Sequence, residues 1–183
     1  SAAILSRGIN AMCAEARTWV DLPFPPDGKI YRGGGFNNHF QSFFTVGKSF
    51  RQPCFLATSF LEAKAQQFYN ERPFVGTDGV PQGIMWVIQV DPAGAHDATK
   101  RCKHVNFVAH SLVVDAAGNP TEQEYLFAAY SIFTVRAVRW GVGGALHRIE
   151  LDAATDNRVA AEGGAGRWAT PVGSEDLPLA PWS

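Results

Sequence analysis

Two glutamates stand two positions apart in the segment Thr121-Glu122-Gln123-Glu124-Tyr125, where a turn-rich stretch meets a run of β-formers. In a strand, residues i and i+2 point to the same face, so the two carboxylates would lie about 7 Å apart. Carboxylates placed in this way repel each other unless a cation lies between them or one pKa rises. The pair therefore marks either a solvated strand end or a site for a cationic ligand.

Two further segments place polar groups beside bare backbone or at a strand end. Arg32 precedes Gly33, and an arginine next to backbone without a side chain can present its guanidinium to a phosphate. Thr58 and Ser59 follow the apolar run 55–57 and precede an expected helix, where one hydroxyl can serve as an N-cap. Taken singly, a surface arginine at a turn and a helix cap are the simpler interpretations.

In this order the three segments resemble the R-S-E signature of the arginine-directed mono-ADP-ribosyltransferases. That signature joins an arginine on an early strand, a serine-containing strand end before a helix, and an ExE motif on a later strand. The matching positions are Arg32, Thr58-Ser59 and Glu122-Gln123-Glu124, within a resemblance that runs from about residue 30 to residue 138. Ala57 departs from the family, because it stands where the Ser-Thr-Ser motif has its first serine.

The resemblance implies an enzyme that cleaves the bond between nicotinamide and ribose in NAD and passes ADP-ribose to an arginine of an acceptor protein. It implies that Glu124, with Ser59 holding it against the ribose hydroxyl, stabilises an oxocarbenium-like transition state. Arg32 would clamp phosphate and ribose, and Gly33 would offer its backbone to the nicotinamide amide. Glu122 would position the acceptor guanidinium and accept its proton. The expected contacts with NAD are Arg32, Gly33, Thr58, Ser59 and Glu124.

Two other functions stay open for the same residues. An NAD glycohydrolase would use the same site with water as the acceptor. A catalytically silent module that binds NAD or another ligand would be free to lose Glu124, so its presence argues against silence.

The elements that must position these residues follow from periodicity and from turn residues. In the first half of the chain we expect a helix over 3–20, a strand at 29–32 that is stopped by Gly33-Gly34-Gly35, a short helix within 36–44 and a strand at 54–57. A helix over 61–68 should follow, starting with a capping box of Ser59 and Glu62, and then a loop at 73–83. In the second half we expect a half-buried strand at 83–91, a weaker strand at 104–114, a loop at 115–121, one or two strands within 122–139, and a strand at 146–151.

This order predicts an α+β fold, and the family resemblance refines it to a split β-sandwich with peripheral helices around an NAD cleft. The chain of 183 residues fits a single catalytic domain. Within it we expect a helical lead-in over 1–28, an NAD-binding core over 29–152, and a tail over 153–183 that packs on the core.

The composition limits the classes of partner and cofactor that we expect. With 16 basic and 17 acidic residues the formal charge is −1, which argues against nucleic acid or an anionic membrane as a charge-driven partner. The five histidines form no HExxH or similar pair, so we expect no metal. Three cysteines without a CxxC pair favour a reducing compartment such as the cytoplasm. We see no signal or membrane-spanning segment and expect a soluble monomer, with a secreted effector as an alternative.

Overall fold

The structure of the protein is a computed structural model that describes residues 27–77, 79–91, 105–107, 124–154 and 177–181. The expected helix over 3–20, the loop over 115–121, Glu122 and most of the tail lie outside these ranges. No helix of the described part is long and apolar enough to cross a membrane.

The described chain is mostly sheet. Its strands are β1 (Lys29–Gly35), β2 (Ser49–Gln52), β3 (Leu56–Ser59), β4 (Phe74–Val75), β5 (Pro81–Gln89), β6 (Val105–Phe107), β7 (Glu124–Phe127), β8 (Ser131–Arg139) and β9 (His147–Ala153). A 3-10 helix, η1 (Asn38–Phe43), follows β1, and an α-helix, α2 (Glu62–Glu71), follows β3. The strand order is β2-β8-β9-β5-β1-β3-β7-β6, with β4 beside β5, and β5 with β9 is a parallel pair.

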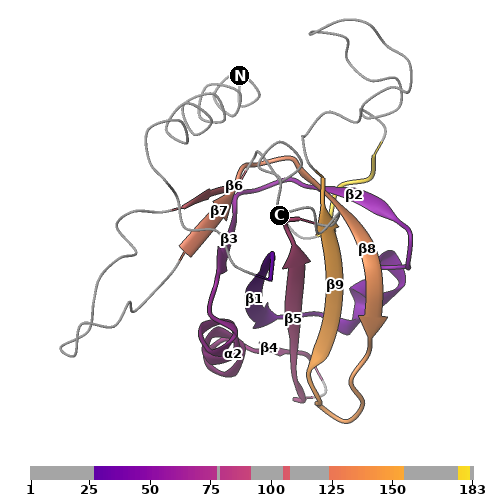
Figure 1. Cartoon of the computed structure of the whole chain (residues 1–183). Coiled ribbons are helices and arrows are strands. Elements are labelled where there is room, and N and C mark those ends of the chain that lie inside the picture. The colour runs from indigo at the N-terminus through magenta and orange to yellow at the C-terminus, as the bar shows by residue number, and fades with distance from the viewer. Residues whose placement is uncertain (1–26, 78, 92–104, 108–123, 155–176, 182–183) are drawn as a thin grey trace, which may run out of the picture.

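The sheet is nearly divided between β1 and β3. These strands share a single paired position, Tyr31 with Ser59, whereas β1 and β5 pair along seven positions. The division separates a half made of β2, β8, β9, β5 and β1 from a half made of β3, β7 and β6 (Figure 1). This arrangement confirms the predicted α+β class and its split sheet, and it leaves a gap in the ladder beside Ser59.

The strand around residue 86 was predicted to be half-buried, but in the structure it is buried on both faces. One face of β5, including Trp86, packs into the main core, which also holds Phe44 and Phe50. The opposite face of β5, Met85 and Val87, packs against Ala65 of α2. Because a helix covers the second face, the side chains on that face are buried and not exposed to solvent.

Several expected boundaries differ from the observed ones. β1 continues through the three glycines instead of stopping at Arg32, and each glycine pairs with β5. β3 covers 56–59 where the expected strand covers 54–57, so Thr58 and Ser59 belong to the strand. The strands β2 and β4 were not predicted, whereas the helix after β1 and the strands β7, β8 and β9 were. The predicted strand at 104–114 is described only at β6.

The segment 177–181 lies against the edge of the five-stranded half. Ala180 is buried among core residues. The amide of Ala180 donates to the carbonyl of Arg51 at 2.8 Å, and the amide of Arg51 donates to the carbonyl of Pro178 at 2.9 Å. This end of the predicted tail thus extends the hydrogen bonding of β2.

Candidate functional site

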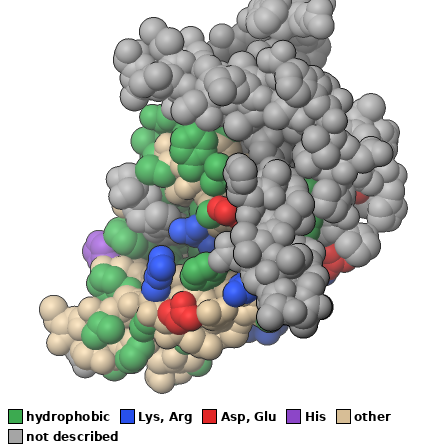
Figure 2. Space-filling model, turned by 90° about the vertical axis from the view of Figure 1, so that its left-hand side faces the viewer, with side chains coloured by type: hydrophobic (Ala, Val, Ile, Leu, Met, Phe, Trp, Pro, Cys, Tyr) green, Lys and Arg blue, Asp and Glu red, His purple; other side chains and the backbone are tan. Residues whose placement is uncertain are grey.

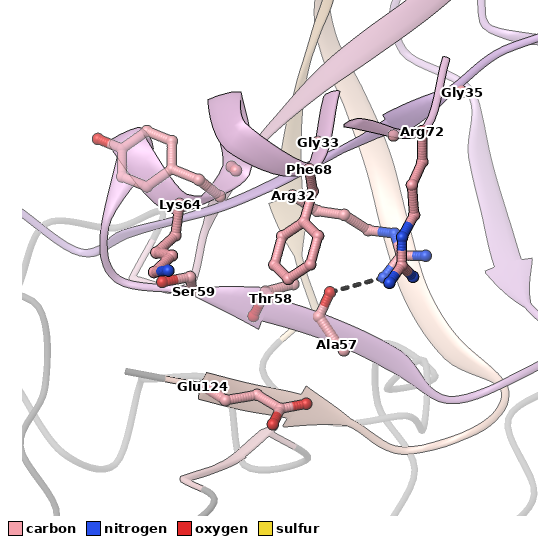
Figure 3. A pocket seen from close by; sticks show the side chains of 13 residues that line it. Arg32, Gly33, Gly35, Ala57, Thr58, Ser59, Lys64, Phe68, Arg72 and Glu124 are labelled. Carbon is pink, nitrogen blue, oxygen red and sulfur yellow. Dashed lines mark hydrogen bonds between the residues drawn. The ribbon is translucent and has the colours of Figure 1, made fainter. Parts of the chain in front are cut away.

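A pocket of about 350 Å³ opens where β3 separates from β1 and α2 passes over both. Its volume falls in the range of about 300–1,000 Å³ that is usual for small-ligand sites. The lining residues are Tyr31, Arg32, Gly33, Gly34, Gly35, Ala57, Thr58, Ser59, Lys64, Ala65, Phe68, Arg72 and Glu124 (Figure 3). The left-hand side of Figure 1, turned to the viewer in Figure 2, carries Lys and Arg side chains beside acidic ones. The gap in the sheet therefore carries a pocket that includes five of the six predicted site residues.

Arg32 bridges the two halves of the sheet. Its Nη1 donates to the carbonyl oxygen of Ala57 at 2.8 Å, from β1 to β3. This bond replaces a ladder contact that the separated strands do not make, and it fixes the direction of the guanidinium plane. Burial lowers the pKa of Arg32, but an arginine guanidinium remains protonated at neutral pH. The pocket thus holds a fixed positive charge at its wall.

Ser59 lies at the meeting point of three strands. It is paired with Tyr31 of β1 and with Glu124 of β7. Residues paired across an antiparallel ladder have their side chains on one face, about 4.5–5.5 Å apart at Cβ. The hydroxyl and the carboxylate that the signature joins are therefore direct cross-strand neighbours.

The predicted capping box at the start of α2 is wrong. The N-cap of α2 is Leu61, and no side chain caps the helix. The oxygen of Ser59 accepts a hydrogen bond from the amide of Leu61 at 3.0 Å, which lies before the first helical residue. The hydroxyl thus orders the turn between β3 and α2 and stays at the pocket wall.

Thr58 points the other way. Its Oγ1 donates to the carbonyl of Tyr125 at 2.7 Å, and the residue is buried. In the alternation of β3 its side chain shares the core face with Leu56, while Ala57 and Ser59 share the other face. The hydroxyl proton of Thr58 is therefore used to tie β3 to β7.

Gly33 is required by the helix above it. A Cβ at this position would overlap the carbonyl oxygen of Ala65 and lie 2.6 Å from its carbonyl carbon. The missing side chain lets the backbone of α2 approach β1 closely. Gly33 thus lines the pocket with its backbone, and its identity follows from helix packing.

A stripe of side chains on α2 and at its C-cap forms a further wall of the pocket, and it is not among the predicted site residues. Lys64 and Phe68 are four residues apart, and Arg72, at the C-cap, follows after four more. Residues at this spacing lie on one side of a helix. The Cζ of Arg72 lies 5.7 Å from the centre of the Phe68 ring. The i, i+4, i+8 spacing directly after the serine strand is the pattern that could have identified them.

The two arginines lie at one end of the pocket. Figure 3 draws the guanidinium groups of Arg32 and Arg72 at the same end, with Lys64 and Ser59 at the other. Among the described lining residues there are three cationic side chains and a single carboxylate, that of Glu124. The balance of charge favours an anionic ligand, and the carboxylate of Glu124 lies across β3 from the two arginines (Figure 3).

Tyr31 contributes a phenol at the α2 side of the pocket. Burial raises its pKa, and the carboxylates of Asp27 and Glu62 raise it further, while Arg148 partly opposes them. The side chain of Arg148 donates to Glu62 at 3.1 Å, across from β9 to the first residue of α2. Tyr31 is therefore a neutral hydrogen-bonding group at physiological pH.

Comparison with protein-family models and with curated proteins finds no match. Among solved structures the chain is similar to ADP-ribosyltransferase Vis, a toxin of Vibrio splendidus that was solved in complex with agmatine, at 17% identity over 80% of this chain and 57% of that one, with a TM-score of 0.49. The chain is also similar to the C3 exoenzyme of Clostridium limosum, at 12% identity over 75% of this chain and 64% of that one, with a TM-score of 0.44.

A third similar structure is ADP-ribosyltransferase HopU1 of Pseudomonas syringae pv. Tomato DC3000, at 19% identity over 69% of this chain and 44% of that one, with a TM-score of 0.40. The chain thus spans less than two thirds of the length of each of these three proteins. At these identities and TM-scores, the activity has to be inferred from the residues of the pocket itself.

Proposed function

We propose that this protein transfers ADP-ribose from NAD to an arginine side chain of an acceptor protein and releases nicotinamide. The observation that carries the proposal is the composition of one pocket, which holds two arginines together with a serine that is paired with a glutamate. In the reaction, the bond between ribose C1′ and the nicotinamide nitrogen breaks, and nicotinamide leaves with the electron pair. A bond from C1′ to an acceptor guanidinium nitrogen forms, and that nitrogen loses a proton.

The arginine end suits the diphosphate of NAD. Arg32 and Arg72 come from different elements, so their planar guanidinium groups can approach a diphosphate from two directions. Bonds between a guanidinium and a phosphate oxygen are short and charge-assisted, and they are about twice as strong as bonds between neutral groups. Arg32 is already oriented by its bond to Ala57, so little conformational freedom is lost when it binds phosphate.

The glutamate end suits a developing positive charge. As the nicotinamide bond lengthens, the ribose becomes oxocarbenium-like, and a fixed carboxylate stabilises it most in the transition state. Glu124 fills that role, and Ser59, its cross-strand partner, can hold the ribose hydroxyl in place. Phe68 offers a flat apolar face in the same pocket for a planar ring.

Arginine as the acceptor rests on Glu122. The pKa of a guanidinium lies far above neutral pH, and the group is a poor nucleophile while it is protonated. A carboxylate next to the attacking nitrogen orients it and accepts its proton. Glu122 stands two positions before Glu124 in the ExE motif, and a glutamate at this position favours arginine over other acceptors by resemblance to the family.

The test is incubation with labelled NAD and agmatine, which carries a guanidinium. We expect the wild type to label agmatine and Glu122→Gln to lose the transfer but keep NAD hydrolysis. Glu124→Gln should lose both by about 10²- to 10³-fold, as for other groups that stabilise a charged transition state. Glu71→Gln is the matched control, because Glu71 lies on the exposed side of α2 and bonds to Gln67.

The same assay separates the alternatives. Full hydrolysis of NAD by the wild type without any labelled agmatine would identify a glycohydrolase. Binding of NAD with neither reaction would identify a silent module. Undiminished transfer by Glu124→Gln would overturn the assignment of the site.

A further inference from the structure

Gly34 is a glycine that no contact within the described part of the chain requires. It lies in β1 opposite Ile84 of β5, and it lines the pocket. A Cβ built on Gly34 would have no described heavy atom within 4 Å. Its backbone is also outside the left-handed region, since Gly34 is not among the glycines with positive φ. Among the described residues, nothing therefore stands in the way of a Cβ at this position.

Its neighbours are different. A Cβ on Gly33 would overlap the backbone of α2, and a Cβ on Gly35 would lie 2.9 Å from the carbonyl oxygen of Arg72 and 3.0 Å from the carbonyl carbon of Pro73. On β5, a Cβ on Gly83 would overlap the ring of Tyr69. Each of these three glycines is explained by a packing contact. Gly34 lies between two of them and has no such contact.

The face to which Gly34 belongs is the face of Arg32. Residues i and i+2 of a strand point the same way and are about 7 Å apart. The side chain missing at Gly34 would thus project from the face of β1 that carries Arg32, opposite the face on which Gly33 and Gly35 meet α2 and the segment after it. Bare backbone at this point leaves room for a group that approaches the guanidinium of Arg32.

We propose that Gly34 is a specificity-determining position, at which the absence of a side chain admits the diphosphate of NAD to the arginine end of the pocket. This inference rests on the proposed function. Two linked phosphates are wide and tetrahedral, so they cannot share the wall with a branched side chain. A ligand without a diphosphate would not need this space.

The proposal predicts opposite effects on binding and on stability. Glycine weakens a strand because it has the most freedom to lose on folding. Replacing it where the backbone is compatible stabilises a protein through the unfolded state. We therefore expect Gly34→Ala and Gly34→Leu to unfold at the same temperature as the wild type or at a higher one, while their affinity for NAD falls.

The experiment is calorimetric titration of the full chain and its variants with NAD and, separately, with ADP-ribose. The affinity for both ligands should fall about tenfold in Gly34→Ala and at least a hundredfold in Gly34→Leu, on the scale at which a methylene changes the fit of a pocket. Gly33→Ala is the contrasting variant: it should lower the unfolding temperature, because its Cβ meets α2.

Each other outcome overturns a separate statement. If Gly34→Leu binds NAD within twofold of the wild type, Gly34 does not determine specificity. If NAD binding falls while ADP-ribose binding is unchanged, the nicotinamide and not the diphosphate lies beside Gly34. If Gly34→Leu unfolds as early as Gly33→Ala, the fold does require the glycine. If the wild type binds neither NAD nor ADP-ribose, the proposed function is wrong, and so is the assignment of a diphosphate to the space beside Gly34.

Discussion

Thr58 and Ser59 are adjacent on β3 and use their hydroxyls for different purposes. Thr58 donates into the core to the carbonyl of Tyr125, while Ser59 faces the pocket opposite Glu124. Strand alternation makes this division unavoidable, because consecutive side chains leave opposite faces. The order of the motif was enough to predict that Arg32, Ser59 and Glu124 would meet. It could not assign the hydroxyls, because their direction depends on the register between β3 and β7.

Thr58→Val tests whether this hydroxyl is structural. The change keeps the shape and removes the donor, so the hydrogen bond from Thr58 to the buried carbonyl of Tyr125 is lost. We expect the free energy of unfolding in urea to fall by about 1–3 kcal/mol, with the affinity for NAD nearly unchanged. Thr58→Ser should restore most of the loss, because it restores the donor. A large loss of NAD affinity in a fully folded Thr58→Val would instead show that the hydroxyl binds the ligand.

At the scale of elements, α2 is held on the sheet by positions without side chains. The helix backbone lies against Gly33, and the ring of Tyr69 lies against Gly83. Triple glycine predicts a turn when only its neighbours in sequence are considered, and this is why the expected strand ended at Arg32. The observed strand continues because a helix thirty residues later in the chain packs on it. Long-range packing of this kind leaves no periodicity to detect.

Gly83→Ala measures this packing. The added methyl would overlap the ring of Tyr69, and overpacking of this kind costs about 1–3 kcal/mol of unfolding free energy. Tyr69→Ala removes the obstacle, so the same glycine substitution should cost much less in that background. A double-mutant cycle from urea unfolding gives the coupling energy. Equal costs in the two backgrounds would show that the ring and Gly83 do not press on each other.

At the scale of the whole molecule, His147 joins segments that are distant in the chain. Its Nδ1 accepts a bond from the amide of Gly141 at 2.9 Å, and its Nε2 is paired with Oδ1 of Asn38 at 2.6 Å. The ring is therefore neutral, with its proton on Nε2. It packs edge-on against the rings of Phe36 and Trp140, both at 5.5 Å between centres. No sequence pattern indicates this role, because the partners of His147 lie in two separate segments, 36–38 and 140–141.

Burial lowers the pKa of His147 below its ordinary value, so stability depends on pH. The unfolded chain takes up a proton near pH 6.5, whereas the folded protein takes it up only at lower pH. The stabilising contribution is complete above about pH 6.5 and is lost as the pH falls through the folded pKa. We expect the free energy of unfolding to fall below pH 6.5 by at most about 1.4 kcal/mol per pH unit.

Urea unfolding between pH 7.5 and pH 5 measures this dependence. His147→Gln should be less stable at neutral pH and should show a shallower decrease on acidification. His39→Gln is the control, because His39 is exposed on η1, and it should follow the wild type. An unchanged slope in His147→Gln would assign the acid sensitivity to other groups.

The near-division of the sheet has a thermodynamic consequence. One paired position and the bond from Arg32 to Ala57 are described between β1 and β3 beside the pocket. A ligand that contacts Arg32 and Gly34 on one half and Ser59 on the other becomes an additional link between them. Because the ligand binds only when both halves are folded, it raises their free energy of unfolding. The increase is about 2.7 kcal/mol at a ligand concentration one hundred times its Kd. A ligand bound in this way thereby serves as a part of the scaffold that binds it.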